Sequence, residues 1–155
     1  MKLALCICPQ WSVETPSFAI GSLKSHINNK DVEVEQVDLN IRTSLYTKEK
    51  NIEEFWDWGN DKPWNSETNF QTEILPYFKD LWHEYIDKLA EYDVVAFTTY
   101  ISNIVTTDYI ARYLKQKNPK IQIWYGGPYS WYAESAGLVE NDNYREFVDI
   151  EDIDK

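Results

Sequence analysis

The sequence predicts an α/β domain in which a parallel sheet is covered by helices on both faces. Strand-like apolar runs alternate with amphipathic helical patterns along the chain, and this alternation favours parallel strands joined by helices. Some of these runs are apolar throughout, which is typical of strands buried on both faces. The chain has 155 residues, of which 43% are hydrophobic, so it suffices for a single domain, residues 1–155, with a substantial core.

The first part of the pattern is strand, helix, strand. Residues 3–8 form a continuous apolar run that Pro9 stops, which predicts a buried strand. The spacing of apolar residues then predicts a helix over 17–28. Apolar residues alternate with glutamate and glutamine over 32–37, which predicts a second strand with one wetter face.

Residues 41–65 interrupt the pattern. Trp56, Trp58 and Trp64 lie there among polar residues, together with a glycine and a proline that break regular structure. We expect an irregular, aromatic-rich insertion with one short helix. Its tryptophans would either form a satellite hydrophobic cluster that holds the insertion to the following helix, or form a lid or partner-binding patch.

The second part returns to regular elements. A strong helical pattern covers residues 66–92, and Pro76 is expected to kink or restart it. A buried strand over 93–99 and a helix over 103–117 follow. The last expected elements are a strand over 121–125, a helix around 131–140 and a short strand over 147–150.

Five strands in this arrangement predict the order 2-1-3-4-5 of the flavodoxin-like, or Rossmann-like, three-layer sandwich. In such a sheet, ligands bind beyond the carboxyl ends of the strands, at the switch point between strands one and three. The loops that follow Cys8, Asp38, Thr99 and Tyr125 are therefore the places to look for a site.

The composition restricts the partners. The chain has 15 basic and 26 acidic residues, a formal charge of −11, and such a surface repels nucleic-acid phosphates and anionic lipid. No stretch approaches the roughly 20 apolar residues of a membrane span. We expect no nucleic-acid and no membrane partner. The two cysteines, Cys6 and Cys8, share one strand face and do not favour a disulfide, so we expect a reducing, cytoplasmic location.

Two of these loops carry residues suited to a neutral ligand. Thr98, Thr99 and Asn103 offer hydroxyls and an amide after the third strand, although Ser102 or Asn103 is also a good helix N-cap. Two glycines after the fourth strand would let a large flat ligand lie against the backbone, or would simply end the strand.

The first loop, which begins at Pro9, carries Trp11. This tryptophan would wall one side of a pocket or pack on a helix.

Several segments together resemble the N-terminal cobalamin-binding domain of cobalamin-dependent radical SAM enzymes. They are Phe97-Thr-Thr-Tyr-Ile-Ser-Asn-Ile104, the Asn118-Pro119 step, and Tyr125-Gly-Gly-Pro128. At the front, an apolar strand ended by a proline, a helix, and a strand that ends in Asp-Leu-Asn40 match the same domain. The resemblance covers about residues 1–40 and 90–150, and it leaves the insertion uncovered.

The resemblance implies a cobalamin-binding module. The two threonines and the two glycines would receive the nucleotide tail, with the dimethylbenzimidazole swung away from cobalt, and the corrin would lie over the strand ends. The implied cofactor-binding residues are Pro9, Gln10, Trp11, Asp38, Asn40, Thr98, Thr99, Tyr100, Asn103, Gly126, Gly127 and Pro128.

The sequence departs from related proteins in two ways. The wider cobalamin-binding superfamily often has an Asp-x-His-x-x-Gly loop, whereas His26 and His83 both fall in predicted helices. We therefore assign no metal-binding residue and expect no lower histidine ligand, so that the lower axial position of cobalt would be open or would hold water or another side chain. Radical SAM chemistry needs Cys-x-x-x-Cys-x-x-Cys, and only Cys6-x-Cys8 is present, so we expect no iron–sulfur cluster in this chain.

The chain alone is therefore not expected to catalyse. It would be a domain without its enzyme or a stand-alone carrier, and it would present cobalamin to a radical SAM catalytic domain or partner protein, such as a methyltransferase. The alternative is a protein-interaction domain with a degenerate, unoccupied pocket, which would use the aromatic insertion as its surface. Flavin-binding, phospho-receiver and hydrolase functions match the strand-end residues poorly.

Overall fold

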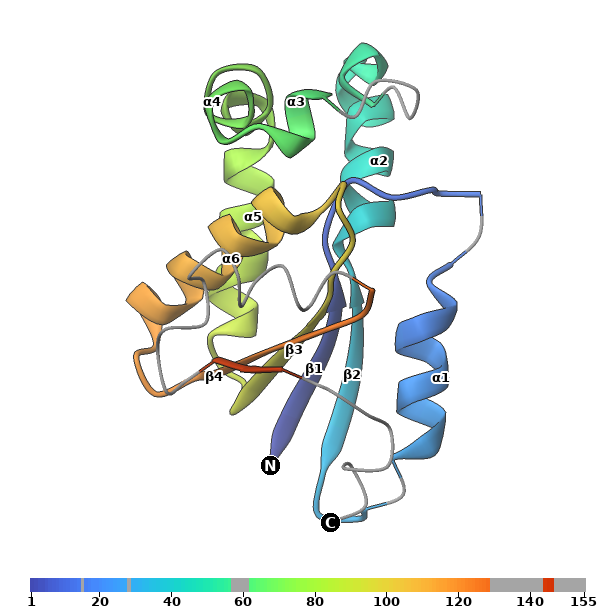
Figure 1. The fold of residues 1–155 in the computed structure, drawn as a ribbon, viewed down its shortest axis with the longest axis vertical. Helices are drawn as coiled ribbons and strands as arrows, with labels where there is room; N and C mark the ends of the chain where they lie inside the picture. The colour runs from blue at the N-terminus through green and yellow to red at the C-terminus, as the bar shows by residue number, and fades with distance from the viewer. Residues whose placement is uncertain (15, 28, 57–61, 129–143, 147–155) are drawn as a thin grey trace.

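A five-stranded parallel sheet forms the centre of the protein. The computed structural model describes residues 1–14, 16–27, 29–56, 62–128 and 144–146. The strands are β1 (Lys2–Ile7), β2 (Glu33–Asp38), β3 (Val94–Thr98), β4 (Gln122–Gly126) and β5 (Tyr144–Glu146). Their order is β2-β1-β3-β4-β5, and all neighbouring pairs are parallel (Figure 1).

This sheet confirms the predicted parallel order over its first four strands. The last strand, β5, is only three residues long and ends before the expected strand over 147–150 begins. That expected strand and the expected helix around 131–140 lie outside the described residues.

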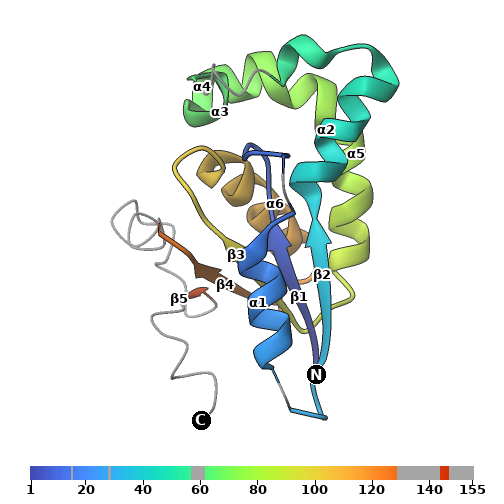
Figure 2. The ribbon, with the colours of Figure 1, turned by 90° about the vertical axis from the view of Figure 1, so that its right-hand side faces the viewer.

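Helices cover both faces of the sheet, and each face has its own core. On one face lies α1 (Phe18–His26) (Figure 2). Its Ile20 packs in one core with Leu3, Leu5 and Ile7. On the other face, the intervening side chains of β1, Ala4 and Cys6 among them, join a larger core. That core receives α2 (Leu39–Lys50), α5 (Leu75–Leu89) and α6 (Ile104–Lys117). The alternation of side chains along β1 therefore produces the two separate cores.

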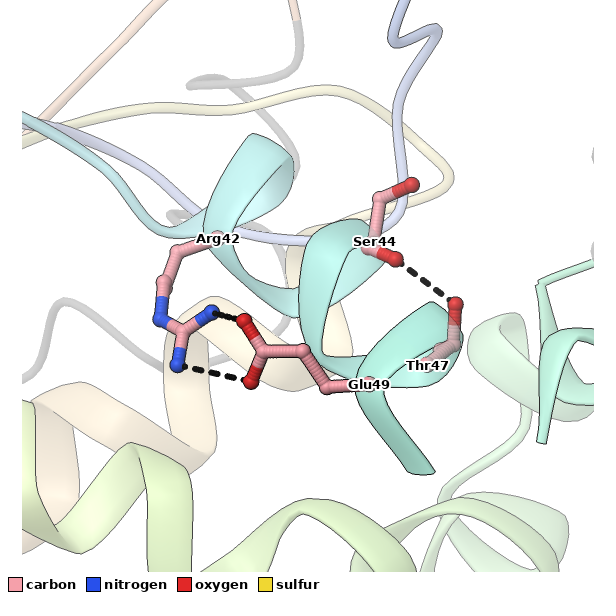
Figure 3. Close-up of polar contacts among 4 residues, drawn as sticks. All are labelled: Arg42, Ser44, Thr47 and Glu49. Carbon is pink, nitrogen blue, oxygen red and sulfur yellow. Dashed lines mark hydrogen bonds and ion pairs between the residues drawn. The ribbon is translucent and has the colours of Figure 1, made fainter. Parts of the chain in front are cut away.

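Helix α2 occupies part of the segment that the sequence predicts to be irregular. Its buried side includes three small hydroxyl residues, Thr43, Ser44 and Thr47, instead of an apolar stripe. The Thr43 Oγ1 donates to the Leu39 carbonyl oxygen at 2.7 Å. The Thr47 Oγ1 donates to the Ser44 carbonyl oxygen at 2.7 Å (Figure 3). These bonds satisfy the hydroxyls of Thr43 and Thr47 inside the core, so a helix forms without the apolar periodicity by which helices are recognised.

The ends and the outer side of α2 follow ordinary helix rules. Asp38 is the N-cap residue, and its carboxylate accepts a hydrogen bond from the Ile41 N–H at 2.8 Å. Asn51 ends the helix in the left-handed conformation, with φ of 55°. On the outer side, Arg42 binds both carboxylate oxygens of Glu49, at 2.7 and 3.2 Å (Figure 3).

An aromatic cluster fixes the chain between α2 and α5. The short elements here are η1 (Glu53–Phe55), α3 (Lys62–Asn65), α4 (Glu67–Asn69) and the π-helix η2 (Phe70–Ile74). Trp64 is buried, and its ring centroid lies 5.8 Å from that of Phe78, 6.4 Å from that of Trp82 and 5.5 Å from that of Trp56. Trp64 belongs to the larger core itself and Trp56 packs against that core, so these two tryptophans hold the segment to α5 as expected, but as part of the main core and not as a satellite cluster. Trp58 lies outside the described residues.

The long helical stretch is divided as the proline predicts. Pro76 lies in the first turn of α5, directly after the π-helix. The missing N–H of proline is tolerated in a first turn, so the proline restarts the helix there. Among the described helices, none combines the length and apolar character needed to cross a membrane.

Candidate functional site

The carboxyl edge of the sheet brings together the four loops that the sequence selects. These loops are residues 8–12 after β1, the β2–α2 junction at 38–40, residues 99–103 after β3, and residues 127–128 after β4. The strands are parallel, so all four loops leave the sheet at the same edge (Figure 1). Their mutual contacts determine which side chains are accessible to a ligand.

Thr99 joins the third loop directly to the end of β4. Its N–H and its Oγ1 both donate to the Gly126 carbonyl oxygen, at 2.7 and 2.8 Å. The hydroxyl that was expected to meet a ligand is thus already bonded to the protein. Thr98 and Thr99 are both buried, so they offer little polar surface to a ligand and mainly determine the shape of this edge.

A glycine is required at position 127 because the end of β3 and the loop after it lie close to the Gly127 backbone. Its φ is +97°, a conformation that side chains rarely adopt. A Cβ there would lie 2.9 Å from the Thr99 carbonyl oxygen and 3.3 Å from the Thr98 Cγ2. The space beside Gly127 is therefore filled by Thr98 and Thr99. Gly127 and Pro128 themselves are exposed, so a ligand would contact this turn from outside.

Asn103 links the ends of β1 and β3 from a fully buried position. Its Nδ2 donates to the carbonyl oxygens of Cys8 and Thr98, at 3.3 and 3.1 Å. Its Oδ1 accepts from the Tyr100 N–H at 2.8 Å. Asn103 occupies the N-cap position of α6, but its side chain makes no capping bond. The alternative that this side chain caps the helix is therefore wrong, because its amide is committed to the two strand ends.

Two further hydrogen bonds join the first loop, residues 8–12, to the third loop, residues 99–103. The Ser102 Oγ donates to the Gln10 carbonyl oxygen at 2.6 Å, and the Gln10 N–H donates to the Ser102 carbonyl oxygen at 3.3 Å. Pro9, Gln10 and Ser102 are all buried. Sequence reasoning missed the role of Ser102, because it considered this hydroxyl only as a helix cap and the partner lies 92 residues away.

Trp11 and Tyr100 form the aromatic part of the edge. Their rings stack with centroids 3.9 Å apart and an interplanar angle of 17°, and both residues are partly buried. The Trp11 N–H donates to the Asn40 Oδ1 at 2.8 Å, and the Asn40 Nδ2 donates to the Ser12 carbonyl oxygen at 3.1 Å. Trp11 therefore stacks on the neighbouring loop, and Asn40 holds the backbone that carries it.

Asp38 is the ionisable candidate residue at this edge. Its carboxylate caps α2 through the Ile41 N–H, and burial raises the pKa of this carboxyl, although hydrogen bonds from the backbone N–H groups of Ile41, Ser17 and Asn40 oppose the rise. A raised pKa means that the folded state binds the proton more tightly than the unfolded chain. Protonation therefore stabilises the fold at low pH, and this contribution is lost as the pH rises through the folded pKa.

We predict that Asp38→Ala lowers the free energy of unfolding by about 1 kcal/mol at neutral pH, because the N-cap is lost. Asp38→Asn keeps an acceptor for the Ile41 N–H and removes the half-buried charge. Its stability relative to the native chain should therefore increase as the pH rises from about 4 to about 7. Urea denaturation of both variants across this range measures the effect. Equal losses in the two variants would show that the side chain does not act as a cap.

The two histidines of the chain lie away from the loops of this edge, and of the two cysteines Cys8 lies at it, as the first residue of the loop after β1. His26 lies in α1, where its Nδ1 contacts the Ser22 carbonyl oxygen at 2.8 Å, and His83 lies in α5, where its Nε2 contacts the Tyr109 hydroxyl at 2.8 Å. Cys6 and Cys8 are free and buried. In the part of the chain that the structure describes, no group of three His, Cys, Asp or Glu side chains is placed to hold a metal ion.

Comparison with known proteins leaves the site to be interpreted from its own geometry. No protein-family model matches the chain, and searches of curated proteins and of solved structures found no significant match.

Proposed function

We propose that this protein is a flavodoxin-like cobalamin-binding module whose ligand lies over the carboxyl edge of the sheet, base-off and without a lower histidine ligand. The observation that carries the proposal is the meeting of the 99–103 loop with the Gly126-Gly127 turn through Thr99. These are two of the segments on which the resemblance to the cobalamin-binding domain of radical SAM enzymes rests. They adjoin at the ends of β3 and β4, beside the switch point between β1 and β3, where ligands of such folds bind.

The accessible residues offer apolar surface to a large, mostly neutral ligand, but they restrict the path of its nucleotide tail. The Trp11–Tyr100 stack and the exposed Ile101 supply apolar surface for a corrin. Gly127 and Pro128 are accessible at the end of β4. The space between Gly127 and Thr99 is filled, so the nucleotide tail would pass outside this turn and not between the two loops. When bound, cobalamin would supply the cobalt chemistry of methyl or radical transfer.

In this proposal the chain holds the cofactor for another domain. The radical SAM catalytic domain would be a separate domain or partner protein, and the chain alone would not catalyse the reaction. Two free, buried cysteines, Cys6 and Cys8, support a reducing, cytoplasmic location.

Titration with hydroxocobalamin, followed by its visible spectrum, tests the proposal. We expect a saturable spectral change with a Kd of about 1 μM, which corresponds to about −8 kcal/mol. Ile101→Glu should weaken binding at least about tenfold, or about 1.4 kcal/mol, because it places a charge against the apolar surface. Leu45→Glu is the matched control, since Leu45 is 47% exposed and Ile101 is 53% exposed.

The outcomes separate the two candidate functions. A saturable change that responds to Ile101→Glu but not to Leu45→Glu supports the cobalamin module. No change at high micromolar ligand argues against it. The second candidate, a protein-interaction domain with an unoccupied pocket, is favoured by the internal bonding of Thr99, Ser102 and Asn103, which leaves few polar atoms for a ligand.

A further inference from the structure

A polar groove lies between α6 and the chain that leads from α4 into α5, and it is separate from the proposed cobalamin site. Its volume is about 240 Å³, which is below the roughly 300–1,000 Å³ of pockets for drug-sized ligands and suits a smaller molecule. The side chains that decide its chemistry are Glu67, Gln71, Asp108, Tyr109, Arg112 and Tyr113. None of the candidate cobalamin-binding residues lines it.

The carboxylates of the groove outnumber its cations. Asp108 is nearly buried, with 8% of its side chain exposed, and its Oδ2 pairs with the Arg112 Nη2 at 2.6 Å. Burial raises the pKa of Asp108, the charge and hydrogen bond of Arg112 oppose the rise, and the charge of Glu67 adds a smaller rise. Glu67 is therefore close enough to act on Asp108 electrostatically. The lining holds one guanidinium and two carboxyl groups, and Arg112 is paired with Asp108, so Glu67 supplies the excess negative charge.

The tyrosines form a rigid aromatic wall next to these carboxylates. The ring centroids of Tyr109 and Tyr113 are 4.7 Å apart. His83 holds both rings, because its Nε2 contacts the Tyr109 hydroxyl at 2.8 Å and its ring meets Tyr113 edge-on at 4.6 Å. Burial lowers the pKa of His83, so the imidazole stays neutral at pH 7 and adds no positive charge to the wall.

The opposite wall is built on the π-helix η2. Phe70 and Ile74 of this element are buried in the core, whereas Gln71 lines the groove. Phe70 stacks on Trp82 with an interplanar angle of 1° and contacts Tyr109 at 5.7 Å. A π-helix is an irregular element that often occurs at functional sites, and here the buried aromatic core holds it against the groove.

We propose that this groove binds a small organic ammonium ion. The ring of Tyr113, which is partly exposed and lines the groove, attracts cations, and the exposed carboxylate of Glu67 adds a charge-assisted contact. The Gln71 amide oxygen offers a further acceptor. Arg112 stays paired with Asp108.

Titration with choline, monitored by the backbone amide signals of the ¹⁵N-labelled chain, tests this site. We expect saturable shifts of Gln71, Asp108 and Tyr113, and no comparable shifts with 3,3-dimethylbutan-1-ol, the uncharged analogue of the same shape. Tyr113→Leu should weaken choline binding about two- to fivefold, as expected for a lost cation–π contact at a partly exposed site.

Two variants, each of which replaces one glutamate by glutamine, separate the local effect of Glu67 from the effect of the net charge of the protein. Glu67→Gln should weaken choline binding about threefold. Glu53→Gln, which changes an exposed acidic residue of η1 outside the groove, should leave it unchanged. Both variants should unfold at the temperature of the native chain. Three outcomes would overturn the proposal, whatever the cobalamin titration shows. They are equal binding of choline and the neutral analogue, the same loss of choline binding in both acidic variants, and no chemical-shift change at a choline concentration on the order of 10 mM.

Discussion

Replacing Trp82 by alanine is expected to lower the free energy of unfolding by about 3–5 kcal/mol, the range for large aromatic residues in cores. Trp82 is fully buried on α5, with the ring centroids of Phe70 and Phe78 at 5.7 and 5.5 Å. Its Nε1 donates to the Thr43 Oγ1 at 3.0 Å and so ties α5 to α2. Alanine leaves a cavity in this cluster and removes the donor. Equilibrium urea denaturation followed by circular dichroism measures the loss.

Two further variants separate packing from the hydrogen bond. Trp82→Phe keeps an aromatic ring but removes the bond to Thr43, and a loss of about 1–2 kcal/mol is expected. Tyr77→Ala removes an aromatic residue from the same helix at a position that is 43% exposed, and a loss below about 1 kcal/mol is expected. If Trp82→Ala cost no more than Tyr77→Ala, the aromatic cluster would not belong to the cooperatively folded core.

Asn103→Ala is expected to cost about 3–5 kcal/mol, although it removes only one polar side chain. The amide satisfies three backbone groups, the carbonyl oxygens of Cys8 and Thr98 and the N–H of Tyr100. Each buried group that loses its partner costs about 1–3 kcal/mol. The loss is measured by urea denaturation, and the variant should also bind hydroxocobalamin less well, because the first and third loops lose their common anchor.

Asn118→Ala serves as the matched asparagine control. Its Nδ2 donates to the Ala90 carbonyl oxygen at 3.0 Å and its Oδ1 accepts from the Lys120 N–H at 3.1 Å, in a partly buried loop. We expect a loss of about 1 kcal/mol there. Asn103→Asp keeps the acceptor but places a buried carboxylate against two carbonyl oxygens, so it should cost at least as much as Asn103→Ala. A fully stable Asn103→Asp variant would rule out the bonding assigned to Nδ2.

The sheet could be predicted because its strands are distinct in composition. The apolar runs that became β1 and β3 are buried on both faces, and such runs stand out from their surroundings. Helix α2 could not be predicted in the same way. Its core side carries Thr43, Ser44 and Thr47, and hydroxyl residues are ordinarily taken as signs of turns or exposed surface. Only the tertiary setting, where Trp82 meets Thr43, shows that this face is buried.

For the candidate site, the positions of the loops could be predicted but the state of their side chains could not. Parallel strands bring their carboxyl ends to one edge, so four loops had to converge there. The bonds that occupy Ser102 and Asn103 connect residues 92 and 95 positions apart. Contacts of that range leave no local pattern in the sequence. The stacking of Trp11 on Tyr100 is of the same kind.

The anchoring by Asn103 has a consequence for how the surrounding sequence tolerates change. All three of its partners are main-chain atoms, at Cys8, Thr98 and Tyr100, and every amino acid supplies a main-chain carbonyl. The side chains at Cys8 and Thr98 could therefore be exchanged for others of similar size while the junction of the two strand ends keeps its shape. Apart from a residue other than proline at position 100, the asparagine would then be the whole sequence requirement of these three bonds, and a motif search that demands the neighbouring side chains as well would pass over proteins built in the same way.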